Sequence, residues 1–203
     1  MRLFIGVVLL ALLVLESHAY VSKFGSSVSK RNPTLTPLCD ASLVVSASYD
    51  LAAGSAVLGT LCGVAENFKG KLGKVFGAGA IVFTLFGGFV AFQTNTLSFK
   101  FDEDSFSLVK SGGEDIGENV VVGGENDWKY SSFVNWGYLP SEKFPILVYF
   151  KETQTSAADR VEAPEFLIPD TLDGQAHFFP AIANTAELTA KFEKNNCKKI
   201  VQK

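Results

Sequence analysis

The sequence predicts an α+β membrane protein, in which a transmembrane helical hairpin precedes a small antiparallel β-barrel or sandwich with a C-terminal helix. Two observations carry this prediction. Residues 42–92 consist mostly of apolar and small residues, in two stretches long enough for membrane helices. From residue 95 onwards, short segments instead alternate apolar and polar residues and are separated by turn signals.

The N-terminus is typical of an ER signal peptide over residues 1–19. It has one positive charge, at Arg2, and then an apolar run of about thirteen residues, which suits a signal peptide and is short for a membrane span. Ser17 and Ala19 are the small residues that a signal peptidase needs just before its cleavage point. We therefore expect cleavage between Ala19 and Tyr20.

Residues 20–38 have the composition of a plastid transit segment, with three basic residues, six Ser or Thr and no acid. An ER signal followed by such a segment, with an aromatic residue at the junction, resembles the bipartite presequences of algae with secondary, red-derived plastids. The predicted location is therefore a plastid membrane, with the thylakoid favoured. The alternative is a plain secretory signal and a membrane of the secretory pathway.

We expect the hairpin within residues 42–92 to consist of transmembrane helices at about 51–66 and 72–92. The second helix is the stronger prediction because no charge lies between Val75 and Phe92. The first is limited by Asp50, since a carboxylate in the middle of a bilayer is costly. Asp50 is therefore expected to cap this helix, and whether the helix spans the membrane fully stays open.

Both predicted helices carry small residues at helical spacing. Ser55, Gly59 and Gly63 lie four residues apart, and Gly73 and Gly77 repeat this spacing. Such faces allow close approach of helices in lipid, where the hydrophobic drive for association is weak. They predict either a docking face for another membrane protein or packing of the two helices on each other. The short loop between the helices favours the second interpretation.

The loop at residues 66–74 contains Lys69, Lys71 and Lys74. The positive-inside rule places these lysines on the stromal side of a plastid membrane and the β domain on the opposite side. The transit-like segment, however, is not followed by a signal for transfer into the lumen, which favours a stromal β domain. The sequence leaves the side of the membrane open.

The β domain is expected at residues 95–195. The first two strands form a hairpin around an acidic turn at 102–104, and a segment at 161–168 is expected to be extended. The predicted strands are 96–101, 106–110, 119–122, 128–135, 145–151 and 177–180.

The C-terminal helix is expected at residues 184–195, with a Lys-rich tail at 196–203. Asn184 and Glu187 have the spacing of a capping box, and Leu188 and Phe192 are expected to face the core. A β-barrel plugged by one such helix is similar to pleckstrin-homology-like (PH-like) domains that follow transmembrane hairpins in bacterial membrane proteins. This likeness concerns the fold and not the function.

The sequence contains none of the usual catalytic or nucleotide-binding motifs. His177 is the only histidine outside the signal peptide, and its apolar neighbours favour a core position over a ligand or base. The three cysteines lack CxxC spacing and are expected to be unpaired thiols. The acidic residues lie beside turn signals, which favours solvated turns over a metal or acid–base site. We expect no enzyme activity, cofactor or metal.

Charge argues against nucleic acid as a partner. Residues 95–203 contain 11 Lys or Arg and 17 Asp or Glu, a net charge of −6. A domain with this charge repels phosphate backbones.

Aromatic residues are concentrated between residues 128 and 144. Period two places Trp128 and Tyr130 on a core face. Trp136 and Tyr138 precede Pro140 in an expected turn, so they are candidate partner contacts or anchors at the membrane interface. The other candidate contacts are the helix glycines Gly59, Gly63, Gly73 and Gly77.

Three segments carry a family resemblance: TLSFKF at 96–101, the aromatic stretch at 118–155, and HFFPAI at 177–182. They resemble domain-of-unknown-function family 3119, an uncharacterised family of cyanobacterial and plastid membrane proteins. The resemblance covers about residues 50–195. It implies a nucleus-encoded protein of oxygenic phototrophs, attached to thylakoid or envelope, and it supplies no catalytic residues.

Together these features predict a non-enzymatic plastid membrane protein. We expect it to act as a scaffold, assembly factor or accessory subunit of a photosynthetic membrane complex, with other thylakoid or envelope membrane proteins as partners. The alternative is a lipid- or pigment-binding membrane module, in which a ligand enters the aromatic interior of the β domain.

Overall fold

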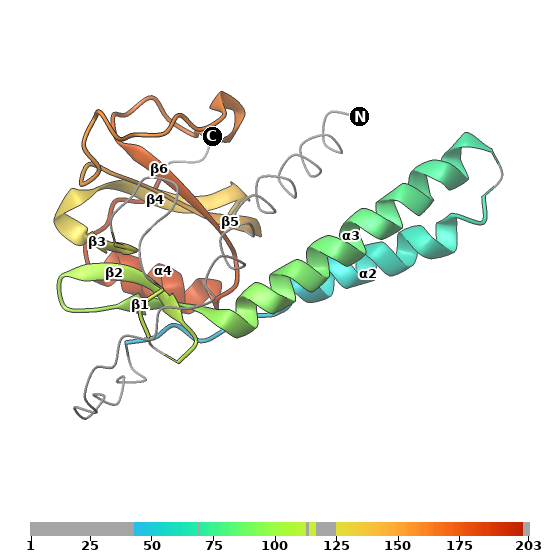
Figure 1. Ribbon diagram of the computed structural model, residues 1–203, viewed down its shortest axis with the longest axis horizontal. Helices are drawn as coiled ribbons and strands as arrows, with labels where there is room; N and C mark the ends of the chain where they lie inside the picture. The colour runs from blue at the N-terminus through green and yellow to red at the C-terminus, as the bar shows by residue number, and fades with distance from the viewer. Residues whose placement is uncertain (1–42, 69, 113, 117–124, 201–203) are drawn as a thin grey trace, which may run out of the picture.

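The computed structural model describes residues 43–200, except residues 69, 113 and 117–124. Figure 1 shows two parts, an arm of two helices and a β domain at one end of this arm. The predicted targeting segments at 1–19 and 20–38 lie outside the described residues.

The arm consists of α2 (Asp50–Ala65) and α3 (Lys71–Thr96), which agree closely with the two helices expected from the sequence. At about 1.5 Å per residue, α2 is about 24 Å long and α3 about 39 Å long. Among the described residues, only α3 has both the length and the apolar composition for crossing a membrane, and α2 is apolar but shorter. The helical hairpin is therefore present, and its insertion in a membrane stays a prediction.

The β domain contains two three-stranded antiparallel sheets. The hairpin expected around residues 102–104 is present, and β5, which contains the predicted strand at 145–151, is the central strand of the second sheet. The first sheet has the strand order β1 (Leu97–Phe101), β2 (Ser105–Lys110), β3 (Asp127–Lys129). The second sheet has the strand order β4 (Phe133–Ser141), β5 (Phe144–Glu152), β6 (Gln175–Pro180).

The segment at 128–135 does not form the single strand that its alternation predicts. It begins in β3 of the first sheet and ends in β4 of the second, and a 3-10 turn, η2 (Tyr130–Ser132), joins them. The N–H of Tyr130 donates to the carbonyl of Asp104, and the N–H of Thr153 donates to the carbonyl of Ser132, both at 3.0 Å. The turn is thus tied to both sheets, and the chain bends here because it passes from one sheet to the other.

Two further predictions concern the extended segment at 161–168 and the strand at 119–122. Residues 161–168 form a loop with a 3-10 turn, η3 (Glu165–Leu167), in place of an extended segment. The strand predicted at 119–122 lies outside the described residues.

The segment just before α2, residues 43–48, also connects the two sheets. The N–H of Val45 donates to the carbonyl of Phe99 in β1 at 2.9 Å. Three residues later, the N–H of Ser48 donates to the carbonyl of Ile182, just after β6, at 2.8 Å. Residues 43–48 therefore hold the ends of both sheets and the base of the arm together.

The helix α4 (Thr185–Lys194) lies against both sheets and completes the core. Leu188 and Phe192 are fully buried, as predicted. The ring of Phe192 contacts rings from β1, β2 and β4, namely those of Phe101, Phe106, Phe133 and Trp136.

One of the two hydrogen bonds of the predicted capping box is present. The side chain of Asn184 accepts a hydrogen bond from the N–H of Glu187 at 3.0 Å, which satisfies a free donor of the first turn. The carboxylate of Glu187 does not close the capping box but accepts from the N–H of Ser46 at 2.9 Å. This bond fastens the start of α4 to the linking segment at 43–48.

Candidate functional site

The surface of the helical arm is the most unusual feature of the molecule. Along α2 and α3, large apolar side chains are 41–69% exposed. Only 22% of the most apolar stretch of α3 is buried. Large exposed apolar patches on a protein mark interaction sites with a membrane or another protein. The exposed residues are Val57, Leu58, Leu61, Val64, Leu72, Val75, Ile81, Leu85 and Phe92.

The seam between α2 and α3 uses the small residues that the sequence singles out. A side chain at Gly59 would collide with Thr84, because a Cβ there would lie 2.7 Å from Thr84 Oγ1. A Cβ at Gly63 would contact Ala80 at 3.8 Å. Gly59 and Gly63 therefore serve the packing of the two helices on each other, the interpretation that the short loop favours.

The other two candidate glycines lie near the tip of the arm. A Cβ at Gly73 would collide with the backbone oxygens of Phe68 and Glu66, and one at Gly77 would lie 3.0 Å from the carboxyl group of Glu66. Both glycines thus make room for the loop that reverses the chain. All four glycines thus face other residues of the arm.

Polar side chains within the arm bond to their own helix. The hydroxyl groups of Ser55, Thr60 and Thr94 donate to carbonyls one turn earlier, at 2.8–2.9 Å. Such bonds leave no hydroxyl unsatisfied when a helix is transferred into lipid. At the base of the arm, the hydroxyl of Tyr49 donates to Asn95 Oδ1 at 2.9 Å and joins the two helices.

Trp136 and Tyr138 are not the exposed contacts that the sequence predicts. They are 0% and 1% exposed, respectively, because the expected turn is part of the long strand β4. Trp136 stacks on Phe192 with 4.5 Å between ring centroids, and its indole N–H donates to the carbonyl of Cys197 at 3.0 Å. The period-two spacing of Trp136 and Tyr138 was the signal for a core face of a strand.

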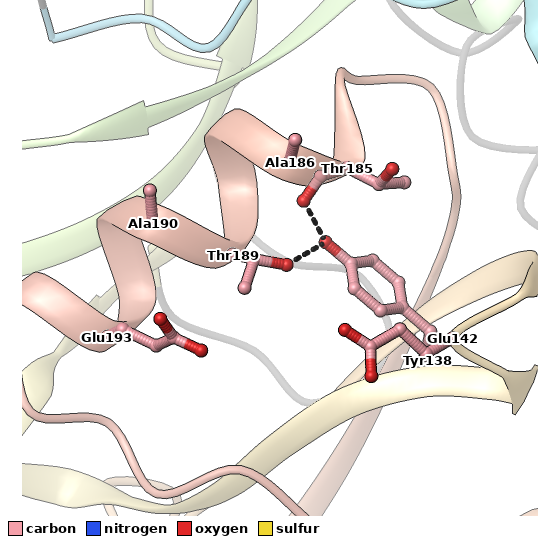
Figure 2. A pocket seen from close by; sticks show the side chains of 7 residues that line it. All are labelled: Tyr138, Glu142, Thr185, Ala186, Thr189, Ala190 and Glu193. Carbon is pink, nitrogen blue, oxygen red and sulfur yellow. Dashed lines mark hydrogen bonds between the residues drawn. The ribbon is translucent and has the colours of Figure 1, made fainter.

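Figure 2 shows Tyr138 below α4 at the margin of an open cleft. Its hydroxyl donates to the carbonyl of Thr185 at 2.8 Å and lies 3.1 Å from Thr189 Oγ1. Burial raises the pKa of Tyr138 to about 12, so the phenol is neutral and serves as a hydrogen-bond donor. The cleft is also lined by Glu142 and Glu193, whose carboxylates give it a negative charge.

The interior of the β domain is filled by aromatic rings. Phe106 alone contacts six of them at centroid distances of 5.0–6.2 Å. Trp128 lies in this core as predicted, with 2% exposure, while Tyr130 is half-buried at its margin. Among the described residues, rings from both sheets and from α4 therefore meet in one closely packed cluster.

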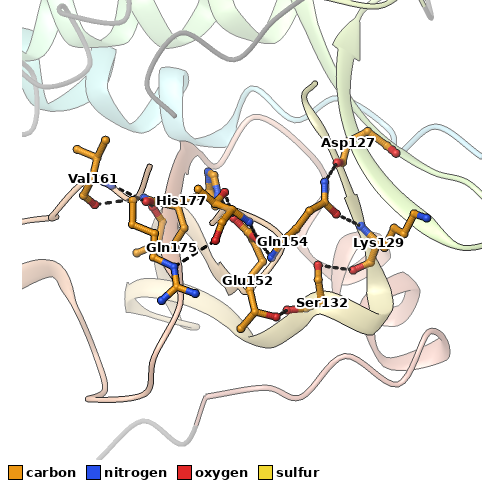
Figure 3. A network of polar contacts seen from close by, with 12 residues as sticks. Asp127, Lys129, Ser132, Glu152, Gln154, Val161, Gln175 and His177 are labelled. Carbon is orange, nitrogen blue, oxygen red and sulfur yellow. Dashed lines mark hydrogen bonds and ion pairs between the residues drawn. The ribbon is translucent and has the colours of Figure 1, made fainter. Parts of the chain in front are cut away.

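His177 is buried, as expected, but it has an acidic partner that the sequence does not reveal. Its Nε2 lies 3.0 Å from Oε1 of Glu152, and both side chains face the core from neighbouring strands (Figure 3). Burial alone would raise the pKa of Glu152, but hydrogen bonds from His177 and Thr155 outweigh burial and lower this pKa to about 2. The carboxylate also accepts from the backbone N–H groups of Gln154 and Thr155, so it holds the loop after β5.

The preceding residue carries the opposite charge on the opposite face of the sheet. Lys151 is 3% exposed, and its Nζ lies 2.7 Å from Oδ1 of Asp170. The other oxygen of Asp170 accepts from Asn135 at 2.7 Å and from the hydroxyl of Tyr149 at 3.1 Å. Burial of Asp170 acts to raise its pKa, but the hydrogen bonds from Lys151 and Asn135 lower it. This network fixes the loop before β6 over the outer face of the second sheet.

Both networks are enclosed by neighbouring side chains of the β domain. The ring of His177 contacts the rings of Trp128 and Phe150, and Asp170 accepts hydrogen bonds from three side chains. In the part of the chain that the structure describes, no three His, Cys, Asp or Glu side chains come together as metal ligands. Cys62 and Cys197, the described cysteines, are free thiols, as predicted.

Comparison with known proteins identifies the family. The family model described as "Protein of unknown function (DUF3119)" matches residues 43–197. The chain therefore belongs to this family, and the match contains the arm, both sheets and α4. No curated protein and no solved structure matches the chain.

Proposed function

We propose that this protein is a non-enzymatic membrane protein of the plastid, anchored in the thylakoid by its helical arm. In our proposal it is a scaffold, assembly factor or accessory subunit of a photosynthetic membrane complex. The single observation that carries this proposal is the arm, whose large apolar side chains point outwards along its length.

The exposed apolar surface supports insertion in lipid. Burying one large apolar side chain is worth about 1.5–3 kcal/mol, so leaving nine such side chains in water would be a large cost. α3 exceeds the roughly 30 Å thickness of the hydrocarbon core, and α2 falls somewhat short of it. We infer that α2 and α3 enter the bilayer together, with the charged tip of the arm, around Glu66 and Lys71, reaching the far headgroups.

The β domain supports a role in binding proteins over a role in chemistry. Its two sheets and covering helix are consistent with a PH-like fold, and its buried polar side chains are held by partners within the domain. The packed aromatic interior counts against the alternative lipid- or pigment-binding module, because such a ligand needs space between the sheets.

The plastid address rests on the sequence of residues 1–38 and on the family resemblance. A fluorescent fusion of residues 1–40 tests it directly. We expect fluorescence in the plastid, and fluorescence confined to the secretory pathway would discard this address.

Membrane anchoring is tested by carbonate extraction of the full-length protein. We expect the protein to stay in the membrane pellet, and the quadruple variant Leu61→Ser, Val64→Ser, Ile81→Ser, Leu85→Ser to be released. The matched control replaces exposed apolar residues of the β domain, Val161, Phe166 and Leu172, by serine and should stay in the pellet. Release of the wild-type protein would contradict the proposal.

The role in a complex is tested by affinity purification from thylakoids in mild detergent. We expect subunits of a photosystem, a cytochrome complex or a translocon in the eluate of the wild-type protein. Elution of the protein alone would contradict the proposed role in a complex but would not contradict the proposed membrane anchor.

A further inference from the structure

The outer edge of β4 is covered by the C-terminal tail of the chain. The N–H of Trp136 donates to the carbonyl of Lys198 at 2.9 Å, and the N–H of Ile200 donates to the carbonyl of Trp136 at 2.8 Å. These bonds pair the tail with β4 in the parallel direction. The tail therefore occupies the place of one further strand, over a very short length.

Two side chains of the tail fit the surface beside β4. Lys199 Nζ lies 2.6 Å from Oε1 of Glu142 and 5.3 Å from the centre of the Trp136 ring. Ile200 lies directly over Gly137, where a Cβ would collide with its side chain. The edge thus accepts a basic residue followed by a branched apolar residue, and glycine at 137 creates the space for the second.

The tail fills only one end of this surface. A cavity of about 200 Å³ remains beside Ile200, between Gly137, Tyr138 and Glu142. The adjoining cleft of about 420 Å³ shares Tyr138 and Glu142 with this cavity and continues along α4 to Glu193 (Figure 2). Carboxylates at both ends of the cleft favour a positively charged occupant.

Few contacts hold the tail on this surface. They are two backbone hydrogen bonds at Trp136, an ion pair with Glu142, whose side chain is 60% exposed, and the contacts of Lys199 and Ile200 with the surface beside β4. Exposed ion pairs contribute little to stability because water screens them. The family match, moreover, ends at residue 197, so the groove lies within the matched region and the segment that covers it lies outside.

We propose that the β4 edge is a docking site for an extended basic segment of a partner protein, and that residues 198–200 occupy this site in competition with the partner. The partner segment adds a strand to the edge of the sheet, with a Lys at Glu142 and a branched apolar residue over Gly137. This inference does not depend on the membrane anchor, because all its residues lie in the β domain and the tail.

The test uses the protein in detergent micelles and a fluorescent peptide of sequence KKIVQK. We expect the chain ending at residue 197 to bind the peptide saturably, and the full-length chain to bind it at least tenfold more weakly. In the shortened chain, Gly137→Val should abolish binding and Glu142→Lys should weaken it at least tenfold. The matched charge reversal Glu103→Lys, in an exposed turn, should leave binding unchanged.

Three results would overturn the proposal. The first is no saturable binding by a shortened chain whose near-UV circular dichroism is native. The second is equal binding of the peptide KEGVQK. The third is a dimer of the full-length chain that disappears on shortening, since the groove would then serve exchange of tails between copies. If shortening unfolds the domain, the full-length variant Lys199→Glu, Ile200→Gly replaces it, with the same expected result.

Discussion

The arm and the β domain place their large apolar side chains in opposite ways. In the arm, Leu61, Ile81 and Leu85 are 60–69% exposed. In the β domain, Phe99, Phe106 and Phe192 are fully buried and contact one another or their neighbours ring to ring. The arm therefore exposes apolar surface to its surroundings, whereas the β domain buries its apolar surface away from water.

Polar side chains show the same contrast. Hydroxyl groups in the arm bond to carbonyls one turn away within one helix. In the β domain, Lys151 and Glu152 reach partners 19 and 25 residues away, on opposite faces of one strand. These hydroxyl groups of the arm are satisfied without tertiary contacts, whereas Lys151 and Glu152 depend on such contacts. The two parts should accordingly respond to different substitutions.

The largest effect is expected from Phe192→Ala. This change removes the ring that joins both sheets to α4 and should lower the free energy of unfolding of the β domain by about 3–5 kcal/mol. Urea titration monitored by near-UV circular dichroism measures the loss, and the arm should keep its helical signal. The control Phe166→Ala, at a ring that is 63% exposed, should change stability by less than about 0.5 kcal/mol. Equal effects of the two changes would refute the assigned core.

Acidification should destabilise the β domain through Glu152. Its pKa is about 2 in the folded protein against an ordinary value of 4.5, so its contribution is complete above pH 4.5. This contribution is lost as the pH falls from 4.5 towards 2, by at most about 3 kcal/mol. Urea titrations across this range measure the slope, which Glu152→Gln should flatten. An unchanged slope in Glu152→Gln would show that other carboxylates cause it, and the control Glu103→Gln should keep the wild-type slope.

Replacing a glycine of the arm by a larger residue should destabilise the arm only where the glycine lies between α2 and α3. Gly59→Leu forces a side chain into Thr84 and should destabilise helix packing by about 1–3 kcal/mol. At Gly54 there is nothing within 4 Å of an added Cβ, so Gly54→Leu is the matched control. Thermal unfolding of helix in the same micelles compares the two. Equal melting of both variants would show that α2 and α3 do not pack on each other as described.

The smallest effect is expected from Asn184→Ala. The change removes the side-chain acceptor at the start of α4 and should cost about 1 kcal/mol, measured by urea titration of the β domain. Thr189→Ala, further along the same helix, removes a hydroxyl near Tyr138 and provides a comparison outside the cap. If Asn184→Ala has no effect, the bond of Glu187 to Ser46 alone is enough to hold the helix start.

Local patterns in the sequence predicted much of the fold. Continuous apolar stretches predicted α2 and α3, alternation predicted β1 and β2, a short dense apolar run predicted β5, and Asn184 predicted the start of α4. The error at Trp136 came from treating Pro140 as the start of a turn, although the period-two spacing continued up to it. The partner of His177 could not be predicted, because Glu152 is 25 residues away and meets it only through the register of β5 and β6.

The junction of the two parts has a mechanical consequence. α3 ends at Thr96 and β1 begins at Leu97, with no linker between them. The carbonyl of Thr96 accepts from the N–H of Ser111 just after β2, and Tyr49 and Asn95 bridge the base of the helices. We therefore expect the arm and the first sheet to move as one rigid unit. A change in the tilt of the arm would then turn the β domain with it and change the direction that the β4 edge faces.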